Sequence, residues 1–146
     1  MFLILGDQLF PQKYLQKYKK DFFYIAEDIG LCTQEKFHKH KLILFLSAMR
    51  SYRDDLINNK FNVIYNEIDQ DKNSSYSEKL EKIIKKKKVK KIITYKISDH
   101  FFDKILRKIC KKLKVELSFI PSPMFLTKQS LKEKFFENNK KPFMGN

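Results

Sequence analysis

The sequence predicts an α/β domain built on a parallel β-sheet of five strands and spanning residues 1–146. Two observations predict this fold. Short apolar runs, typical of strands that are buried on both faces, recur along the chain. Between them lie stretches whose apolar residues are spaced three and four positions apart, as in amphipathic helices. Strands that alternate with helices in this way form parallel sheets covered by helices on both faces.

The first half of the chain supplies three strands and one long helix. Apolar runs predict the strands at residues 2–5, 21–27 and 61–65. Residues 12–20 are polar and predict a short helix or loop, and residues 28–36 predict a loop. From residue 37 to Asn58 apolar positions recur at helical spacing, which predicts a long amphipathic helix.

The second half supplies two further helices and two further strands. Strands are predicted at residues 92–95 and 115–120, and helices over roughly 77–87 and 99–113. Serines before the first of these helices can cap it, at positions 74, 75 and 77. Pro121 and Pro123 stop the last strand, and residues 124–137 predict a loop and a short polar helix.

The complete pattern is that of a doubly wound domain, flavodoxin-like or Rossmann-like. We expect all five strands to run parallel, with the strand at 2–5 in the centre of the sheet and the strand at 115–120 at an edge. An antiparallel hairpin among them would contradict this architecture.

The composition indicates neither a membrane protein nor a secreted one. No apolar run reaches the length of a membrane span, and no basic segment precedes the first apolar run as in a signal peptide. Cys32 and Cys110 are too few for a disulfide framework or a metal site. We therefore expect a cytoplasmic protein with no membrane contact.

The formal net charge is +14, and only three of the 31 basic residues are arginine. Two interpretations remain open. The lysines can reflect a lysine-biased composition with solvated helix faces, or they can provide a weak contact with DNA. The run of lysines at 85–88 also suits the negative end of a helix dipole.

The strongest candidate site follows the first strand, in the segment Gly6-Asp7-Gln8-Leu9. Ligands of open α/β sheets bind at the carboxyl ends of the strands. Gly6 lets a ligand approach the backbone, while Asp7 and Gln8 offer hydrogen-bond acceptors and a donor. Glu27 ends the second strand at the same edge. The alternatives are that Asp7 caps a turn and that Glu27 bonds to a loop amide.

The long helix adds His40, Met49 and Arg50 as candidates. His38 and His40 are two positions apart, so we expect them on different faces and do not expect them to bind a metal together. Met49 lies on the apolar stripe and can equally be a core residue. Arg50 and Arg53 share a face, where they can bind an anion or simply cover the helix.

Motifs of other site classes are missing. A dinucleotide-binding Gly-x-Gly-x-x-Gly is excluded because only Gly6 follows the first strand, and no phosphate-binding Walker loop occurs. No pairing of a nucleophile with a base is recognisable. We therefore expect no metal site in this chain and no catalytic activity from the chain alone.

Several segments, in this order, resemble the cryptochrome/photolyase-related family of prokaryotic iron-sulfur photolyases, which includes (6-4) photolyases. They are Leu3-Ile4-Leu5-Gly6-Asp7-Gln8-Leu9, Ala26-Glu27, Phe37-His38-Lys39-His40-Lys41, Leu46-Ser47-Ala48-Met49-Arg50, Met124-Phe125-Leu126-Thr127 and Lys141-Pro142-Phe143-Met144. The resemblance covers the N-terminal α/β domain of that family. It implies that residues 121–146 lead toward a helical FAD domain of a longer flavoprotein.

The resemblance also implies a function. In this family the α/β domain holds an antenna chromophore, a ribityl-lumazine, and passes absorbed light to a flavin that reduces a DNA photoproduct. The residues carried over to that site are Gly6, Asp7, Gln8, Leu9, Glu27, His40, Met49 and Arg50. FAD and a [4Fe-4S] cluster are expected only in the missing C-terminal part.

One segment departs from the family pattern. Residues 96–100 lack the Pro and Glu expected there, so no ligand contact is carried over to that loop. Two other functions stay open beside the antenna domain. The chain can be a free-standing flavodoxin-like domain for nucleotide binding or signalling, or a remnant that folds without a ligand.

Overall fold

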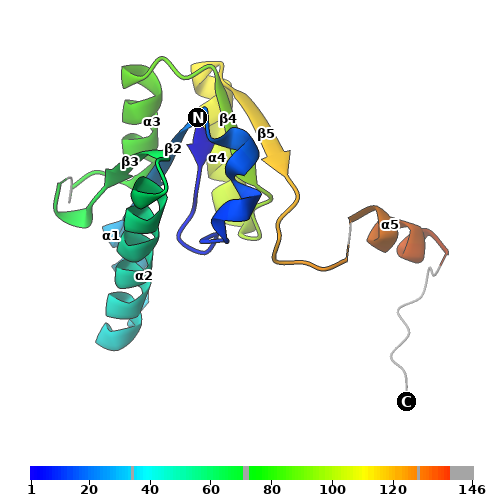
Figure 1. The fold of residues 1–146 in the computed structure, drawn as a ribbon, viewed down its shortest axis with the longest axis horizontal. Helices are drawn as coiled ribbons and strands as arrows, with labels where there is room; N and C mark the ends of the chain where they lie inside the picture. The colour runs from blue at the N-terminus through cyan, green and yellow to red at the C-terminus, as the bar shows by residue number, and fades with distance from the viewer. Residues whose placement is uncertain (34, 71–72, 128, 139–146) are drawn as a thin grey trace.

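The sheet predicted from the sequence is confirmed in a computed structural model that describes residues 1–33, 35–70, 73–127 and 129–138. Its strands are β1 (Phe2–Leu3), β2 (Phe22–Ala26), β3 (Asn62–Asn66), β4 (Lys91–Tyr95) and β5 (Glu116–Ile120). The strand order is β3-β2-β1-β4-β5, and every neighbouring pair runs parallel. As predicted, the first strand lies in the centre and the last at an edge (Figure 1).

Helices connect these strands. The α-helices are α1 (Ile29–Thr33), α2 (Lys39–Asn58), α3 (Tyr76–Lys86), α4 (His100–Leu113) and α5 (Gln129–Asn138). Short 3-10 helices occupy Gln12–Tyr14, Gln16–Tyr18 and Ile68–Gln70. Ser75 caps α3 in a capping box with Glu78, which confirms one of the three predicted serine caps. None of the helices in the described ranges is both long and apolar enough to cross a bilayer.

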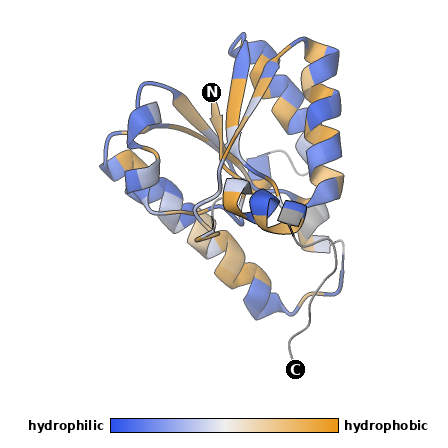
Figure 2. Ribbon diagram, turned by 90° about the vertical axis from the view of Figure 1, so that its right-hand side faces the viewer, coloured by the Kyte–Doolittle hydropathy of each residue, from blue (hydrophilic) through white to orange (hydrophobic). Residues whose placement is uncertain are grey.

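The core has two layers because side chains alternate across the strands. Phe2 and Ile4 of the first apolar run face α2, where Met49 and Leu56 are buried with them. Leu3 faces the opposite way, toward buried side chains of α3 and α4. The apolar stretches of the strands, which are covered by helices on both faces, are visible in orange in Figure 2. The domain is therefore doubly wound, with α2 on one face of the sheet and α3 and α4 on the other.

Two elements differ from the prediction. The strand predicted at 2–5 is shorter, because the chain turns at Gly6, although the Ile4 amide still donates to Tyr24. Residues 29–33, predicted as loop, form the one-turn helix α1, in which the Thr33 hydroxyl donates to the Ile29 carbonyl. A single turn is too short to show a periodic apolar pattern, and Gly30 disfavours a helix there.

The three helices that precede β3, β4 and β5 end in the same way. Lys60, Lys88 and Lys114 have positive φ angles of 61°, 50° and 53°. In each case the amide of the following residue donates back to a carbonyl in the last helical turn, as in a Schellman motif. Glycine is the usual residue at this position, so three lysines adopt a conformation that is unfavourable for a side chain.

The segment after β5 leads away from the sheet to α5, which stands apart from the other helices (Figure 1). Its apolar side chains are more than half exposed, at Leu131, Phe135 and Phe136. The motif at residues 141–144 lies outside the described residues.

Candidate functional site

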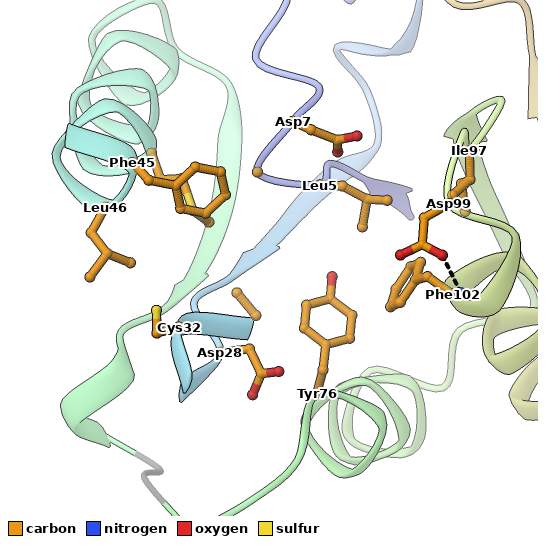
Figure 3. Close-up of a pocket in the computed structure, with 13 residues that line it drawn as sticks. Leu5, Asp7, Asp28, Cys32, Phe45, Leu46, Tyr76, Ile97, Asp99 and Phe102 are labelled. Atoms are coloured by element: carbon orange, nitrogen blue, oxygen red, sulfur yellow. Dashed lines mark hydrogen bonds between the residues drawn. The ribbon is translucent and has the colours of Figure 1, made fainter. Parts of the chain in front are cut away.

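A pocket opens at the carboxyl edge of the sheet, where the sequence predicts a ligand site. It has a volume of about 220 Å³ and lies between the turn after β1, the end of β2, α2 and the start of α4 (Figure 3). Its apolar wall is formed by Leu5, Phe45, Leu46, Met49, Ile97 and Phe102. Residues at or after the ends of β1, β2 and β4, together with helices from both faces of the sheet, therefore contribute to this pocket.

The polar groups of the pocket are acidic or hydroxylic. Asp7 follows β1, Asp28 follows β2 and Asp99 follows β4, while Tyr76 is the first residue of α3. Asp99 is also the N-cap of α4, because its carboxylate accepts from the amides of Phe101 and Phe102 at 2.8 and 3.1 Å. No lysine, arginine or histidine is among the described residues that line the pocket.

Two of these groups have a buried polar atom without a hydrogen-bond partner in the described part of the chain. These atoms are the Tyr76 hydroxyl and Oδ1 of Asp28. Figure 3 shows the Tyr76 ring pointing from α3 toward the turn after β1. Burial, with the nearby Tyr24, Asp28 and Asp7, raises the pKa of Tyr76 well above its usual value, so its hydroxyl stays protonated. Buried polar atoms normally have partners, and these two are available to a ligand.

Gly6 brings the backbone close to the pocket wall. A Cβ atom at this position would collide with the Phe45 ring and lie 3.0 Å from Sδ of Met49. Because the nearest atoms belong to the far end of Phe45, a larger residue would push this ring rather than the backbone. The absence of a side chain at Gly6 therefore allows the Phe45 ring to lie where it does in the pocket wall.

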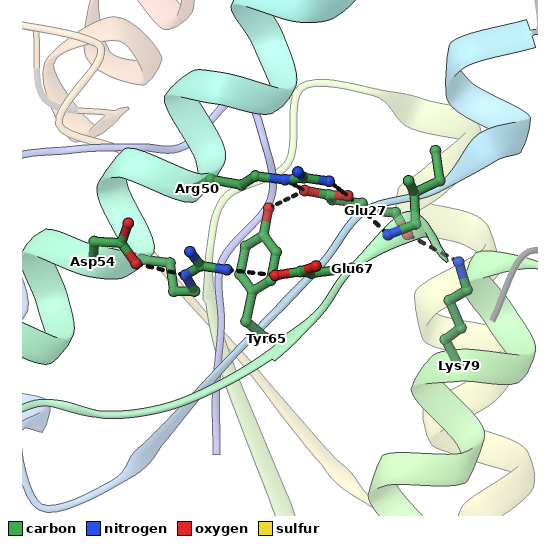
Figure 4. Close-up of polar contacts among 8 residues, drawn as sticks. Glu27, Arg50, Asp54, Tyr65, Glu67 and Lys79 are labelled. Carbon is green, nitrogen blue, oxygen red and sulfur yellow. Dashed lines mark hydrogen bonds and ion pairs between the residues drawn. The ribbon is translucent and has the colours of Figure 1, made fainter. Parts of the chain in front are cut away.

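Glu27 lies just beyond β2 and belongs to a separate polar network (Figure 4). Its carboxylate accepts from Nε and Nη2 of Arg50 at 2.7 and 2.9 Å, from the Tyr65 hydroxyl at 2.6 Å and from the Ile68 amide at 2.8 Å. Burial alone would raise the pKa of Glu27, but hydrogen bonds from these three residues and the Arg50 charge hold it below its usual value. The side chain is thus a charged structural anchor between β2, β3 and α2.

The same network extends to both sides. Lys79, which is buried in α3, donates from Nζ to the main-chain carbonyl of Glu27 at 3.0 Å. Arg53, one turn after Arg50, pairs with Glu67 at 2.8 Å. Both arginines of α2 therefore bind carboxylates of the chain itself, and they cover the end of the sheet.

The structure brings three of the eight site residues predicted from the sequence into the pocket, namely Gly6, Asp7 and Met49. Gln8 is buried and turns away, and its Nε2 points to the Lys96 carbonyl at 3.5 Å. Leu9 packs against the core on the α2 side.

The remaining three predicted residues lie outside the lining. Glu27 and Arg50 bind each other, and His40 is exposed in the first turn of α2. His38 caps this helix by accepting from the His40 amide, and the two imidazole rings lie 4.8 Å apart. The prediction that they occupy different faces is therefore wrong, because His38 precedes the helix and turns back over it. Among the described residues no cluster of three metal-ligating side chains occurs.

Sequence reasoning missed Asp28, Tyr76 and Asp99. Asp99 ends the loop after β4 at the same edge as Asp7, so the rule that selected Asp7 could have selected it too. Asp28 stands beside Glu27, and the sequence alone does not show which carboxylate faces the pocket. Tyr76 carries no signal, because a tyrosine at the start of a helix has no preferred role.

Comparisons with known proteins address the family of the chain. A comparison with curated protein sequences found no match. The family model described as deoxyribodipyrimidine photo-lyase-related protein matches residues 2–146, a range that contains the whole pocket and the Glu27 network. The chain therefore belongs to the deoxyribodipyrimidine photo-lyase-related protein family.

Proposed function

We propose that the chain is the antenna-chromophore-binding domain of a light-driven DNA-repair flavoprotein related to the iron-sulfur and (6-4) photolyases. The pocket at the carboxyl edge would hold a ribityl-lumazine. Membership of the photolyase-related family supports the parent activity. The observation that carries the ligand assignment is the pair of unpartnered buried atoms, the Tyr76 hydroxyl and Oδ1 of Asp28, beside an apolar wall.

The residues of the pocket fit a ligand of this chemistry. A lumazine ring offers an apolar surface for Phe45, Met49 and Phe102, and its imide and ribityl hydroxyls are hydrogen-bond donors. Asp7 and Asp28 can accept from such donors, while the protonated Tyr76 hydroxyl can donate to a ring carbonyl. Small-molecule sites commonly combine an apolar lining with a few polar groups that orient the ligand.

Charge argues against the alternative of a nucleotide-binding domain. A phosphate group in this pocket would face Asp7, Asp28 and Asp99, with no basic side chain among the described lining residues to compensate. Like charges at short range disfavour binding. A ribityl chain without phosphate avoids this repulsion, so an uncharged polyol fits the pocket better than a flavin or purine nucleotide.

The bound chromophore would supply light absorption, and the excitation would pass to FAD in the helical part of the parent protein. The chain itself would bind and orient the chromophore and exclude water from its apolar face. We propose that FAD and the [4Fe-4S] cluster are held outside this chain and that residues 121–146 lead toward that part. Exposed apolar side chains at Met124, Phe125 and Leu126 support a contact with another domain.

The test is a titration of the chain with a ribityl-lumazine and, in parallel, with FMN, followed by ligand fluorescence anisotropy. We expect the lumazine to bind and FMN to bind more weakly, because its phosphate meets the carboxylates. The Asp7→Ala variant should lose about 1–3 kcal/mol of binding free energy if its hydrogen bonds to the ligand are buried. The control is Asp55→Ala, which removes an exposed carboxylate of α2 outside the pocket.

Two outcomes would count against the proposal. Unchanged affinity in a folded Asp7→Ala variant would remove Asp7 from the site. Tighter binding of FMN than of the lumazine would favour the nucleotide-binding alternative and discard the antenna assignment.

A further inference from the structure

We propose that Phe45 determines the size of the ring system that the pocket accepts, because its side chain closes off a second apolar chamber beside it. The inference rests on the proposed function, since it narrows the class of chromophore that the same site holds. That class is a bicyclic ring system with a polyol chain, as opposed to a tricyclic one. Phe45 would then be a specificity-determining residue, in addition to the polar groups that orient the ligand.

The second chamber lies beside the pocket, at the start of α2. It has a volume of about 190 Å³ and is lined by Cys32, Phe37, Lys41, Leu42 and Phe45. The ammonium group of Lys41 lies over the Phe37 ring, 4.2 Å from its centre, so this cation already has an aromatic partner. Phe37, Leu42 and Phe45 give the chamber an apolar wall, whereas three carboxylates line the first pocket.

Two residues line both cavities and therefore form the partition between them. They are Cys32 of α1 and Phe45 of α2. Figure 3 shows the Phe45 ring extending from α2 toward the turn after β1. The ring comes so close to Gly6 that a Cβ atom there would collide with its Cζ atom and lie 3.0 Å from Cε1. The ring therefore spans the gap between α2 and this turn.

The partition is not part of the hydrophobic core. Leu42 and Leu46, on the same apolar stripe, are half-buried, and within the described ranges neither packs against the two core clusters. The buried core residues of α2 are Met49 and Leu56, and Phe45 is 38% exposed. Contiguous apolar side chains outside the core often mark a ligand site. The first turns of α2 therefore serve the cavities rather than the core.

The volumes indicate how the partition limits a ligand. Sites for drug-sized ligands commonly have volumes of about 300–1,000 Å³. Each chamber alone is smaller than this, at about 220 and 190 Å³, whereas the two chambers joined would fall within the range. With the Phe45 ring in place, the pocket suits one compact ring system. Without it, a longer fused system has room to extend into the second chamber.

A ribityl-lumazine and riboflavin form a matched pair of probes for this limit. Both carry a ribityl chain and a pyrimidinedione ring, and riboflavin is longer by one fused ring. Riboflavin has no phosphate, so the repulsion that disfavours FMN does not affect the comparison. The dimethylbenzene end of riboflavin is apolar, as is the wall of the second chamber. The position of the Phe45 ring then decides whether this end can be accommodated.

A stacking contact is the other role that Phe45 can have, because its ring also belongs to the apolar wall of the first pocket. Loss of a stacking contact weakens both ligands in the same proportion. Loss of a partition weakens the binding of the lumazine and strengthens that of riboflavin. The ratio of the two affinities therefore separates the two roles.

The experiment titrates the chain with a ribityl-lumazine and with riboflavin, and it follows the fluorescence anisotropy of each ligand. Small differences in apolar size are discriminated by about tenfold or more, so the unsubstituted chain should prefer the lumazine by at least this factor. The test variant is Phe45→Ala, which removes the ring but no buried core residue. Its affinity for riboflavin should rise about tenfold, while its affinity for the lumazine should fall.

The matched control is Leu46→Ala, because Leu46 lines the first chamber and is not among the lining residues of the second. It should weaken both ligands and leave the ratio of their affinities nearly unchanged. The rescue variant is Leu42→Phe/Phe45→Ala, which fills the second chamber with a ring from another position. Its affinity for riboflavin should return toward that of the unsubstituted chain.

A milder variant guards against loss of the fold. Phe45→Leu keeps an apolar side chain on α2 but lacks the ring that reaches Gly6, so it should shift the ratio in the same direction as Phe45→Ala and by less. Circular dichroism of each variant verifies that the helices are retained.

Two results would overturn the role of Phe45. Equal affinity of the unsubstituted chain for the lumazine and riboflavin would mean that ring size is not restricted. A change of both affinities by the same factor in Phe45→Ala would reduce the residue to a stacking contact. The proposed function is judged separately. If the unsubstituted chain binds neither ligand and Phe45→Ala binds riboflavin, the partition stands and the lumazine assignment fails. If neither protein binds either ligand, both proposals fail.

Discussion

Asp7 and Glu27 follow neighbouring strands at one edge of the sheet, yet their carboxylates have different surroundings. Asp7 is exposed and lines the pocket, whereas Glu27 is 1% exposed and bound by Arg50, Tyr65 and the Ile68 amide. The sequence predicted the edge for both residues. It could not separate their roles, because the partners of Glu27 come from β3 and α2, elements that are distant in the chain.

The ion pair between the buried Glu27 carboxylate and the partly exposed Arg50 side chain leads to a prediction about stability at the residue scale. Replacement of Glu27 by Gln leaves the Arg50 guanidinium without its carboxylate, and we expect a loss of about 1–3 kcal/mol in unfolding free energy at neutral pH, less than for a fully buried pair because water reaches Arg50. The control is Glu67→Gln, whose carboxylate is more exposed than that of Glu27 and whose loss should cost less than about 1 kcal/mol. Urea denaturation of both variants measures the difference.

The pH dependence of this loss has a definite sign. The folded-state pKa of Glu27 lies below the ordinary value of 4.5, so the folded protein binds this proton less tightly than the unfolded chain does. The contribution of Glu27 is therefore fully present above its unfolded pKa and disappears as the pH falls through the folded one. The difference in unfolding free energy between the Glu27→Gln variant and the unsubstituted chain should therefore shrink below pH 4.5. A gap that stays constant to pH 3 would show that the carboxylate is not held ionised.

At the scale of elements, the prediction succeeds where an element is long enough to show a periodic pattern of apolar residues. α2, α3 and α4 are long enough to show their apolar spacing, and their bounds differ from the predicted ones by only one or two residues. α1 has a single turn and no such spacing, and β1 is shortened by the turn at Gly6. The pocket also resists prediction, because it is assembled from the ends of several elements rather than from one motif.

The positive φ of the lysines that follow α2, α3 and α4 predicts that glycine at such a position stabilises the protein. Lys88→Gly should raise the unfolding free energy by about 0.5–1 kcal/mol, because relief of the left-handed strain exceeds the entropy that glycine adds to the unfolded chain. The midpoint of thermal unfolding should then rise by about 1–4 °C. The neighbouring Lys87 has a φ of −96°, so Lys87→Gly serves as the control and should be destabilising. Destabilisation by both substitutions would mean that the Lys88 side chain has a structural contact of its own.

For the whole molecule, the sheet gathers acidic side chains in one pocket of a basic protein. Three carboxylates line the pocket at the carboxyl edge, although the formal net charge of the chain is +14. The sequence predicted the α/β fold, the central strand and the edge strand, because alternation of strands and helices is a property of the entire chain. It did not predict that Asp28 and Asp99 join Asp7 in the pocket, because these residues come together only when the strands align.

The position of β1 in the sheet has a consequence for synthesis of the protein. β1 pairs with β2 through Phe2 and Phe23 but also with β4 through Phe2 and Ile93, so its second partner is made much later. Until β4 leaves the ribosome, the middle strand has one open side and half of its hydrogen-bonding groups lack a neighbour. Unpaired strand edges of this kind invite association between nascent chains. The order of the strands therefore makes chaperone protection most important while α3 and β4 are being translated.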